Sequence, residues 1–245
     1  MAEELKASIY IILFILMGAL AGGVSAKLLS IFFKGNYRYL QIFCGGMIAG
    51  LLALDVVPEI IKHYRPIGIF TGVSIGVLFM LLLDRYLHQE RSHSFQRPSL
   101  FIMLFLALII HSIPTGIALG MSFHNQHFQD ESLLAVILLH HIPEGMVMMI
   151  TVLVSNVKDR IFVFSCVLLS ISIGITTFIG MNIDSDSIKL HTLFLGAAIG
   201  TLCYVIFHEI LWNGFKVNKN SKMIIVAILG FLAILPFLHI SGFSH

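Results

Sequence analysis

Two short segments near the middle of the chain contain histidine, proline and glycine at the same spacing. Residues 111–116 read His-Ser-Ile-Pro-Thr-Gly, and residues 140–145 read His-His-Ile-Pro-Glu-Gly. Residues four apart share a helix face, so His140 and Glu144 would lie on one face. His111 and Thr115 have the same spacing, and His141 would lie about 100° round from His140. Imidazoles with a carboxylate suit a transition metal such as zinc, whereas Mg²⁺ and Ca²⁺ prefer oxygen ligands. The pattern predicts a metal or proton site.

The elements that would hold these residues are eight apolar runs. The 245-residue chain is 58% hydrophobic and 11% charged, against roughly 25% charged in soluble domains, so it has too few charges for a water-facing surface. A membrane-spanning helix needs about 20 mostly apolar residues. The runs of about that length are Leu5–Phe33, Tyr39–His63, Ile67–Tyr86, Leu100–Phe123, Ser132–Ser155, Ile161–Met181, Ile188–Trp212 and Met223–Ile240. We therefore expect a single all-α, eight-helix membrane domain over residues 1–245.

Polar residues inside these runs mark candidate sites, because ionisable groups are costly in hydrocarbon and are usually functional there. The paired motifs fall in the fourth and fifth runs, where Pro114 and Pro143 should open polar space between the two helices. Further candidates along a path are Ser112, Thr115, His208, Glu209, Asp55 and Glu59. Three runs precede the pair and three follow it. This layout predicts a 3+2+3 inverted-repeat transporter with its site near the membrane midplane.

The distribution of lysine and arginine predicts the orientation, since cytoplasmic loops carry the excess of these residues. With eight spans, eleven of the fifteen fall on one side and four on the other. The richer side contains the connection 89–97, so we expect that connection inside and both termini outside, most simply in the plasma membrane. The net charge is +2 and no basic block of five or more residues occurs, which argues against a nucleic-acid partner.

With these motifs the chain resembles the ZIP (Zrt- and Irt-like) metal transporters. The specific part is His-Ile-Pro-Glu-Gly at residues 141–145, and the helix number, external termini and cytoplasmic loop agree along nearly the whole chain. The resemblance implies that the metal ligands are His111, His140, His141 and Glu144. It also places His208 and Glu209 on the inner exit segment of helix seven. Glu59 matches the Pro-Glu end of the family's helix two.

The sequence departs from the family pattern in two helices. The family has His-Asn-x-x-Asp/Glu in helix four, whereas this chain has Ser112 for the amide and Thr115 for the acid. Helix six of the family often supplies a Glu before a Pro, whereas Ile171–Met181 offers Thr176 and Thr177 as polar candidates. With fewer carboxylates, we expect one well-formed metal position and a preference shifted away from harder ions such as Mn²⁺.

We expect transport of divalent transition metals toward the cytoplasm, zinc above all, with Fe²⁺ or others as further substrates. The partners would be the metal ion and the lipid bilayer, with a homodimer left open; no prosthetic group is expected. A proton-coupled carrier of a small organic solute is the alternative, because the same His and Glu could relay protons. An intramembrane metalloprotease is disfavoured, because Ile142 follows His141 and no HExxH pair occurs. The protein is therefore not expected to be an enzyme.

Overall fold

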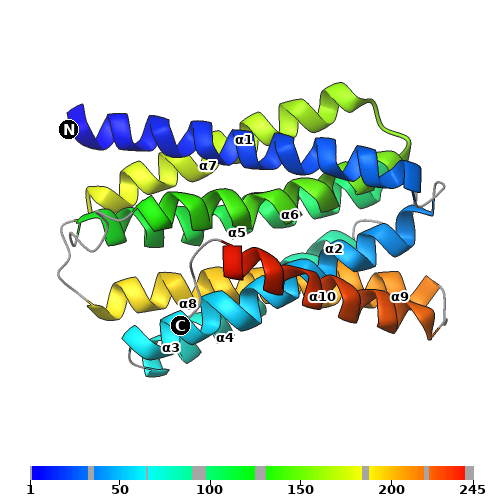
Figure 1. The fold of residues 1–245 in the computed structure, drawn as a ribbon. Helices are drawn as coiled ribbons and strands as arrows, with labels where there is room; N and C mark the ends of the chain where they lie inside the picture. Colours follow the sequence, from blue (N-terminus) through cyan, green and yellow to red (C-terminus); the bar gives the residue numbers. More distant parts are fainter. Residues whose placement is uncertain are drawn as a thin grey trace.

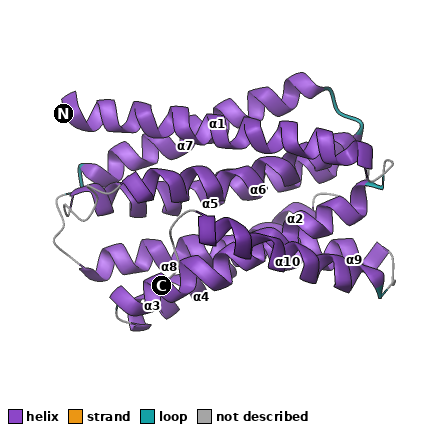
Figure 2. Cartoon of the chain, viewed as in Figure 1, coloured by secondary structure: helices purple, strands orange, loops and turns teal. Residues whose placement is uncertain are grey.

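The chain folds into helices connected by short segments. The computed structural model describes residues 2–32, 36–64, 66–89, 98–124, 131–183, 188–217 and 221–240. The elements are α1 (Ala2–Phe32), α2 (Tyr37–Leu51), η1 (Leu52–Val56), α3 (Val57–His63), α4 (Pro66–Gln89), α5 (Pro98–His124), α6 (Glu131–Ser155), α7 (Asp159–Met181), α8 (Ile188–Tyr204), η2 (Val205–Trp212), α9 (Asn213–Val217) and α10 (Lys222–Ile240). No strand occurs in these described ranges (Figure 2). The all-α prediction is confirmed.

Several of the helices are long and apolar enough to cross a membrane. Among the described residues, six segments meet this condition: Glu3–Ile31, Tyr37–Lys62, Pro66–Tyr86, Phe101–Phe123, Asp159–Met181 and Lys189–Lys216. The predicted fifth and eighth spans are represented by shorter apolar segments, His141–Ser155 and Lys222–Pro236. The count of eight spans and the 3+2+3 arrangement therefore stay predictions, as does the single domain over residues 1–245.

The helices pack into two bundles (Figure 1). In the first bundle, α1 packs against α6 and α7, and α5 packs against α7 and α6. In the second bundle, α4 packs against α8, and α2 packs against α10 and η2. The main contacts between the bundles are those of α5 with α8 and of α2 with α6. The two predicted motif helices, α5 and α6, thus belong to one bundle, and each of them faces the other bundle.

Glycine residues hold each bundle together, because they let two helix backbones approach closely. A Cβ atom at Gly22 of α1 would lie 2.0 Å from the Ile142 carbonyl oxygen of α6. In the second bundle, a Cβ at Gly46 of α2 would lie 2.1 Å from the Ala227 carbonyl oxygen of α10. Among the glycines in the described ranges, every close contact of this kind joins helices of the same bundle. Each bundle is therefore packed backbone to backbone, whereas side chains make the contacts between the bundles.

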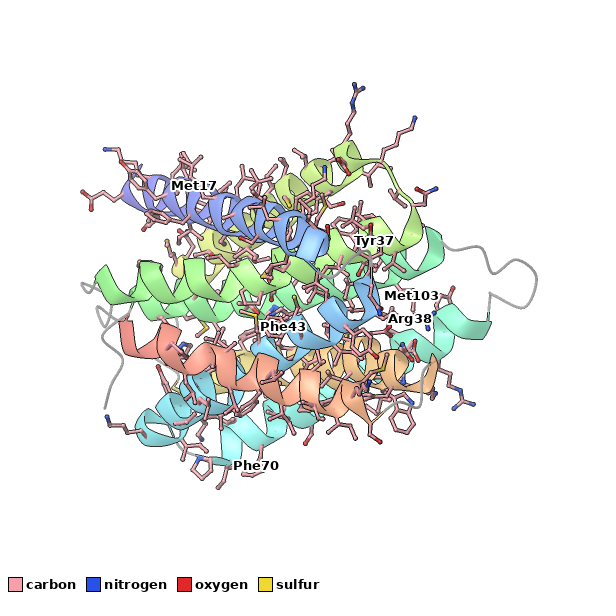
Figure 3. The ribbon with its side chains drawn as sticks, turned by 45° about the vertical axis from the view of Figure 1, so that its right-hand side comes forward. Met17, Tyr37, Arg38, Phe43, Phe70 and Met103 are labelled. Atoms are coloured by element: carbon pink, nitrogen blue, oxygen red, sulfur yellow. The ribbon has the colours of Figure 1, made fainter. Side chains whose placement is uncertain are left out.

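The outer surface of both bundles is apolar. Met17 of α1 is 53% exposed and Phe70 of α4 is 73% exposed, and both side chains project away from the helices (Figure 3). Many other large apolar side chains are exposed along α1, α4, α7 and α10. Exposed apolar area on this scale would drive aggregation in water and is normal for a lipid-facing surface.

Two helices contain wide, π-helical turns where the sequence carries candidate polar residues. The segment η1 includes Asp55 and precedes Pro58 at the start of α3. Proline lacks an N–H, so the carbonyl group four residues earlier loses its usual partner and the helix widens there. The segment η2 includes His208 and Glu209; its sequence has no proline, and nothing in it explains the wider turn. By contrast, α5 and α6 continue as α-helices through Pro114 and Pro143.

Candidate metal site

Glu144 is the centre of the candidate site, because its carboxylate lies next to two imidazoles. Its side chain is 2% exposed in the middle of α6. The Nδ1 atom of His141 lies 2.7 Å from Glu144 Oε2, and the Nε2 atom of His111 lies 3.8 Å from Glu144 Oε1. Both imidazoles are also buried, at 3% and 4% exposure. A buried carboxylate is costly unless it is paired or neutralised, so this arrangement needs a cation or proton to balance it.

His111 also contacts a hydroxyl group of α8. Its Nδ1 atom lies 2.9 Å from the Thr201 hydroxyl oxygen. That hydroxyl donates to the carbonyl groups of Ala197 and Ala198, so its oxygen can accept a hydrogen bond from Nδ1–H. In a neutral ring with the hydrogen on Nδ1, the lone pair is on Nε2, the nitrogen nearer to Glu144. A hydrogen-bond partner on the other ring nitrogen is typical of metal-binding histidines.

The same reasoning applies to His141. An ionised carboxylate only accepts hydrogen bonds, so the contact between His141 Nδ1 and Glu144 Oε2 places the proton on Nδ1. In a neutral ring, the lone pair of His141 is then on Nε2. Thr115 lies close by: its hydroxyl donates to the His111 carbonyl oxygen at 2.8 Å and lies 3.3 Å from His111 Nε2.

Ser112 faces a different helix from its neighbour His111. Its hydroxyl lies 2.8 Å from the Ser172 hydroxyl of α7 and donates to the Ile109 carbonyl oxygen at 2.6 Å. Thr176 of α7 donates to the Ser112 carbonyl oxygen at 3.4 Å. These contacts lie inside the first bundle. Of the two helix-four departures from the ZIP pattern, Thr115 contacts the candidate site directly, and Ser112 contacts α7.

Two of the predicted site residues lie outside the part of the chain whose side chains are described. His140 is on α6 and Glu59 is on α3, but their side chains are not described. Among the described residues, no group of three or more His, Cys, Asp and Glu is arranged to hold a metal ion. The contacts of His111 and His141 with Glu144 are thus pairwise, and the predicted four-ligand set stays a prediction.

The predicted path residues on the second bundle form a separate polar group. His208 Nδ1 lies 3.6 Å from Glu209 Oε1, and the Asn213 amide donates to Glu209 Oε2 at 3.3 Å. The His208 ring packs against the Tyr204 ring with centroids 4.8 Å apart. Glu209 and Tyr204 line a small cavity with Asp84 of α4 and Ala107 of α5. Asp55 is half-buried on η1, in the other helix with a wide turn.

Sequence reasoning missed two polar residues of neighbouring helices, one beside a candidate ligand and one beside Ser112. Thr201 orients His111 from α8, and Ser172 contacts Ser112 from α7. Thr201 is seven residues before His208, a spacing that places the two on one helix face. That spacing is a usable signal for Thr201. Ser172 lies four residues before the polar candidate Thr176, which likewise places these two on one helix face.

Apolar helices with a buried carboxylate and imidazoles between them define an integral, multi-pass membrane protein with a polar site inside it. Residues 87–235 match the family model described as "ZIP Zinc transporter". The chain therefore belongs to the ZIP zinc transporter family, a family of metal-ion transporters.

A curated relative agrees with this family. The chain is 24% identical over 193 residues to a protein of Arabidopsis thaliana named "Putative zinc transporter At3g08650". The match covers 74% of this chain and 31% of the relative. The chain thus matches about a third of the length of that relative.

Proposed function

We propose that the protein transports divalent transition-metal ions, zinc above all and Fe²⁺ among others, toward the cytoplasm. The observation that carries this proposal is the pair His111 Nε2 and Glu144 Oε1, two buried potential ligand atoms 3.8 Å apart. Zinc binds nitrogen and oxygen ligands at about 2 Å, so one ion could contact both atoms after a small movement. His140 and His141 complete the proposed ligand set, and one metal position is expected.

The two-bundle packing supports a rocking mechanism in which one bundle moves against the other. All four proposed ligands lie on α5 and α6 of the first bundle. Backbone contacts at glycines stiffen each bundle, and the bundles meet through side chains. In this proposal the ion leaves its ligands and passes His208 and Glu209 of the second bundle. Asp55 and Glu59, which we also propose to line the path, belong to the other helix with a wide turn. Midplane sites between moving bundles are typical of secondary transporters.

Uptake by the purified chain in proteoliposomes tests the proposal. We expect saturable uptake of radioactive zinc, a lower rate with iron and the lowest with manganese, because imidazole suits softer ions better. Labelled small organic solutes, offered with an inward proton gradient, should not accumulate. Solute accumulation without zinc uptake would favour the proton-coupled carrier and overturn the metal proposal.

The proposed orientation, with external termini in the plasma membrane, has its own test. Single cysteines at Ser94 and Asn125, in a background lacking Cys44, Cys166 and Cys203, should react with a membrane-impermeant thiol reagent from opposite sides. Asn125 should react in intact cells, and Ser94 only after the membrane is opened, because the positive side of a membrane protein faces the cytoplasm. Reaction of both cysteines in intact cells would contradict the eight-span orientation.

A further inference from the structure

A third buried histidine lies outside the candidate metal site. His191 of α8 is 4% exposed, and its Nε2 atom lies 2.9 Å from the Ser122 hydroxyl and 3.1 Å from the Ala118 carbonyl oxygen, both on α5. The ring of Tyr64, at the end of α3, meets the imidazole edge-on with centroids 5.3 Å apart. His191 and Tyr64 belong to the second bundle, whereas Ser122 and Ala118 belong to the first. This contact therefore joins the two bundles.

The direction of the hydrogen bonds follows from the chemistry of the partners. The Ala118 carbonyl oxygen can only accept, and the Ser122 hydroxyl donates its hydrogen to that same carbonyl at 3.0 Å. The Ser122 oxygen is therefore an acceptor toward the imidazole. His191 Nε2 consequently has a hydrogen and donates it to both oxygen atoms. The donor lies on the second bundle and both acceptors lie on the first.

This contact and the one between His111 and Thr201 lie along the same interface of α5 and α8. Residue numbers rise along α5 from His111 to Ser122 and fall along α8 from Thr201 to His191, so the two helices are antiparallel. Eleven residues of α-helix span about 16 Å. His191 therefore lies about three helical turns from the candidate metal site, toward the end of α5 and the beginning of α8.

The opposite end of the same interface contains a cavity. It lies between α4, α5 and the region where α8 meets η2, and its lining includes Asp84, Ala107, Tyr204 and Glu209. The cavity has room for about one water molecule. The interface is thus hydrogen-bonded on one side of the metal site and hollow on the other. Separation of α8 from α5 would open a route to the metal site from the His191 side.

We propose that His191 is a positioning residue that keeps the transport path closed on the side of the membrane where α5 ends and α8 begins. Its N–H group holds the second bundle against Ser122 and the Ala118 carbonyl group of the first. Opening on that side requires both hydrogen bonds to break. The inference rests on the proposed function, because a path that opens alternately is needed only in a transporter.

A single cysteine placed between the His191 contact and the candidate metal site tests this role, because its labelling rate reports how often the path opens. Ala198 of α8 is buried between the levels of His191 and Thr201. The test uses Ala198→Cys in a chain whose three natural cysteines are replaced by alanine. This protein is placed in proteoliposomes, and an impermeant thiol reagent is added on the side where Asn125→Cys reacts. A net hydrogen bond contributes enough to change a closed-to-open ratio by about fivefold. His191→Leu should therefore raise the labelling rate by about fivefold or more, and His191→Gln, which keeps an N–H donor, should restore most of the parent rate.

Thr192→Val provides the matched control. The Thr192 hydroxyl donates to the Lys189 carbonyl of its own helix, and its side chain contacts Gly68 of α4, so its contacts stay within the second bundle. We expect the parent labelling rate for this variant. An unchanged rate in His191→Leu, or an equal rise in Thr192→Val, would overturn the proposal.

If His191→Leu does not fold, Ser122→Ala decides the question: a faster labelling rate supports the role and the parent rate contradicts it. The labelling experiment needs no metal, so the two proposals can fail separately. If the parent protein takes up zinc but His191→Leu does not change the labelling rate, only the role of His191 is refuted. If the labelling rate changes but the parent protein takes up no zinc, only the transport proposal is refuted.

Discussion

Glu144→Gln is expected to abolish saturable zinc uptake while leaving the protein folded and inserted in the membrane. The amide keeps the shape of the carboxylate, and its oxygen can still accept the hydrogen bond from His141 Nδ1. It has no negative charge to neutralise a divalent ion in a buried site. Removing even an indirect partner of a metal ligand typically lowers metal affinity 10–100-fold. The loss of a direct charged ligand should exceed about 100-fold in zinc uptake, measured with radioactive zinc in proteoliposomes.

Two other variants show whether the loss of zinc uptake is specific to the carboxylate or reflects misfolding. His111→Ala should weaken zinc uptake less than Glu144→Gln, because water or another imidazole can replace a neutral ligand. Ser172→Ala removes a hydroxyl that contacts Ser112 inside the first bundle, and it should leave uptake close to the parent rate. Elution as a single folded species in detergent shows that each variant is intact. Normal uptake and affinity in Glu144→Gln would disprove the proposed site, and with it the proton-coupled alternative that uses the same side chain.

Gly46→Ala is expected to destabilise the protein. In an exposed helix this substitution would be favourable by roughly 0.5–1 kcal/mol, because glycine is a poor helix former. Here the added methyl group would lie 2.1 Å from the Ala227 carbonyl oxygen, an atom of the backbone that cannot turn aside. Overpacking of this kind costs about 1–3 kcal/mol. The sign of the effect is therefore opposite to that given by helix propensity alone.

Gly214→Ala is the matched control for this substitution. It lies in the same bundle, and the nearest atoms to an added Cβ are the side-chain atoms Cγ1 and Cδ1 of Ile42, at 3.0 and 3.2 Å. Those atoms can move by a few tenths of an ångström, so the thermal midpoint in detergent should stay close to the parent value. An unchanged or higher midpoint for Gly46→Ala would show that α2 and α10 are not in close backbone contact.

The sequence was sufficient to predict the helical class, and it named the residues of the candidate site. The helices could be predicted because a membrane span needs a continuous apolar segment, which is visible in the local sequence. The spacing in the motif at residues 140–145 put His140 on the face of Glu144, and the resemblance to the ZIP family added His111 and His141; the structure places His141 and His111 beside Glu144, at 2.7 and 3.8 Å. The full four-ligand set stays a prediction.

Contacts between helices far apart in sequence could not be predicted in the same way. The spacing of Thr201 to His208 shows a shared helix face, but neither it nor the sequence around His191 shows that these residues face α5. Which helix packs against which depends on side chains from both, and a single sequence contains no pairing information. The wide turn at η1 could have been inferred from Pro58, whereas η2 has no such signal. These supporting residues became visible only once the two bundles were in place.

The placement of all proposed ligands on one bundle has a thermodynamic consequence. If α5 and α6 move as a unit, the ion keeps the same ligand atoms whichever side of the membrane it faces. Its intrinsic dissociation constant is then the same on both sides, and an equal affinity cannot by itself raise the concentration on either side. Unless its movement is coupled to another gradient, such a protein equilibrates the metal across the membrane. Net flow toward the cytoplasm would be set by the low level of free metal that cytoplasmic chelators maintain there.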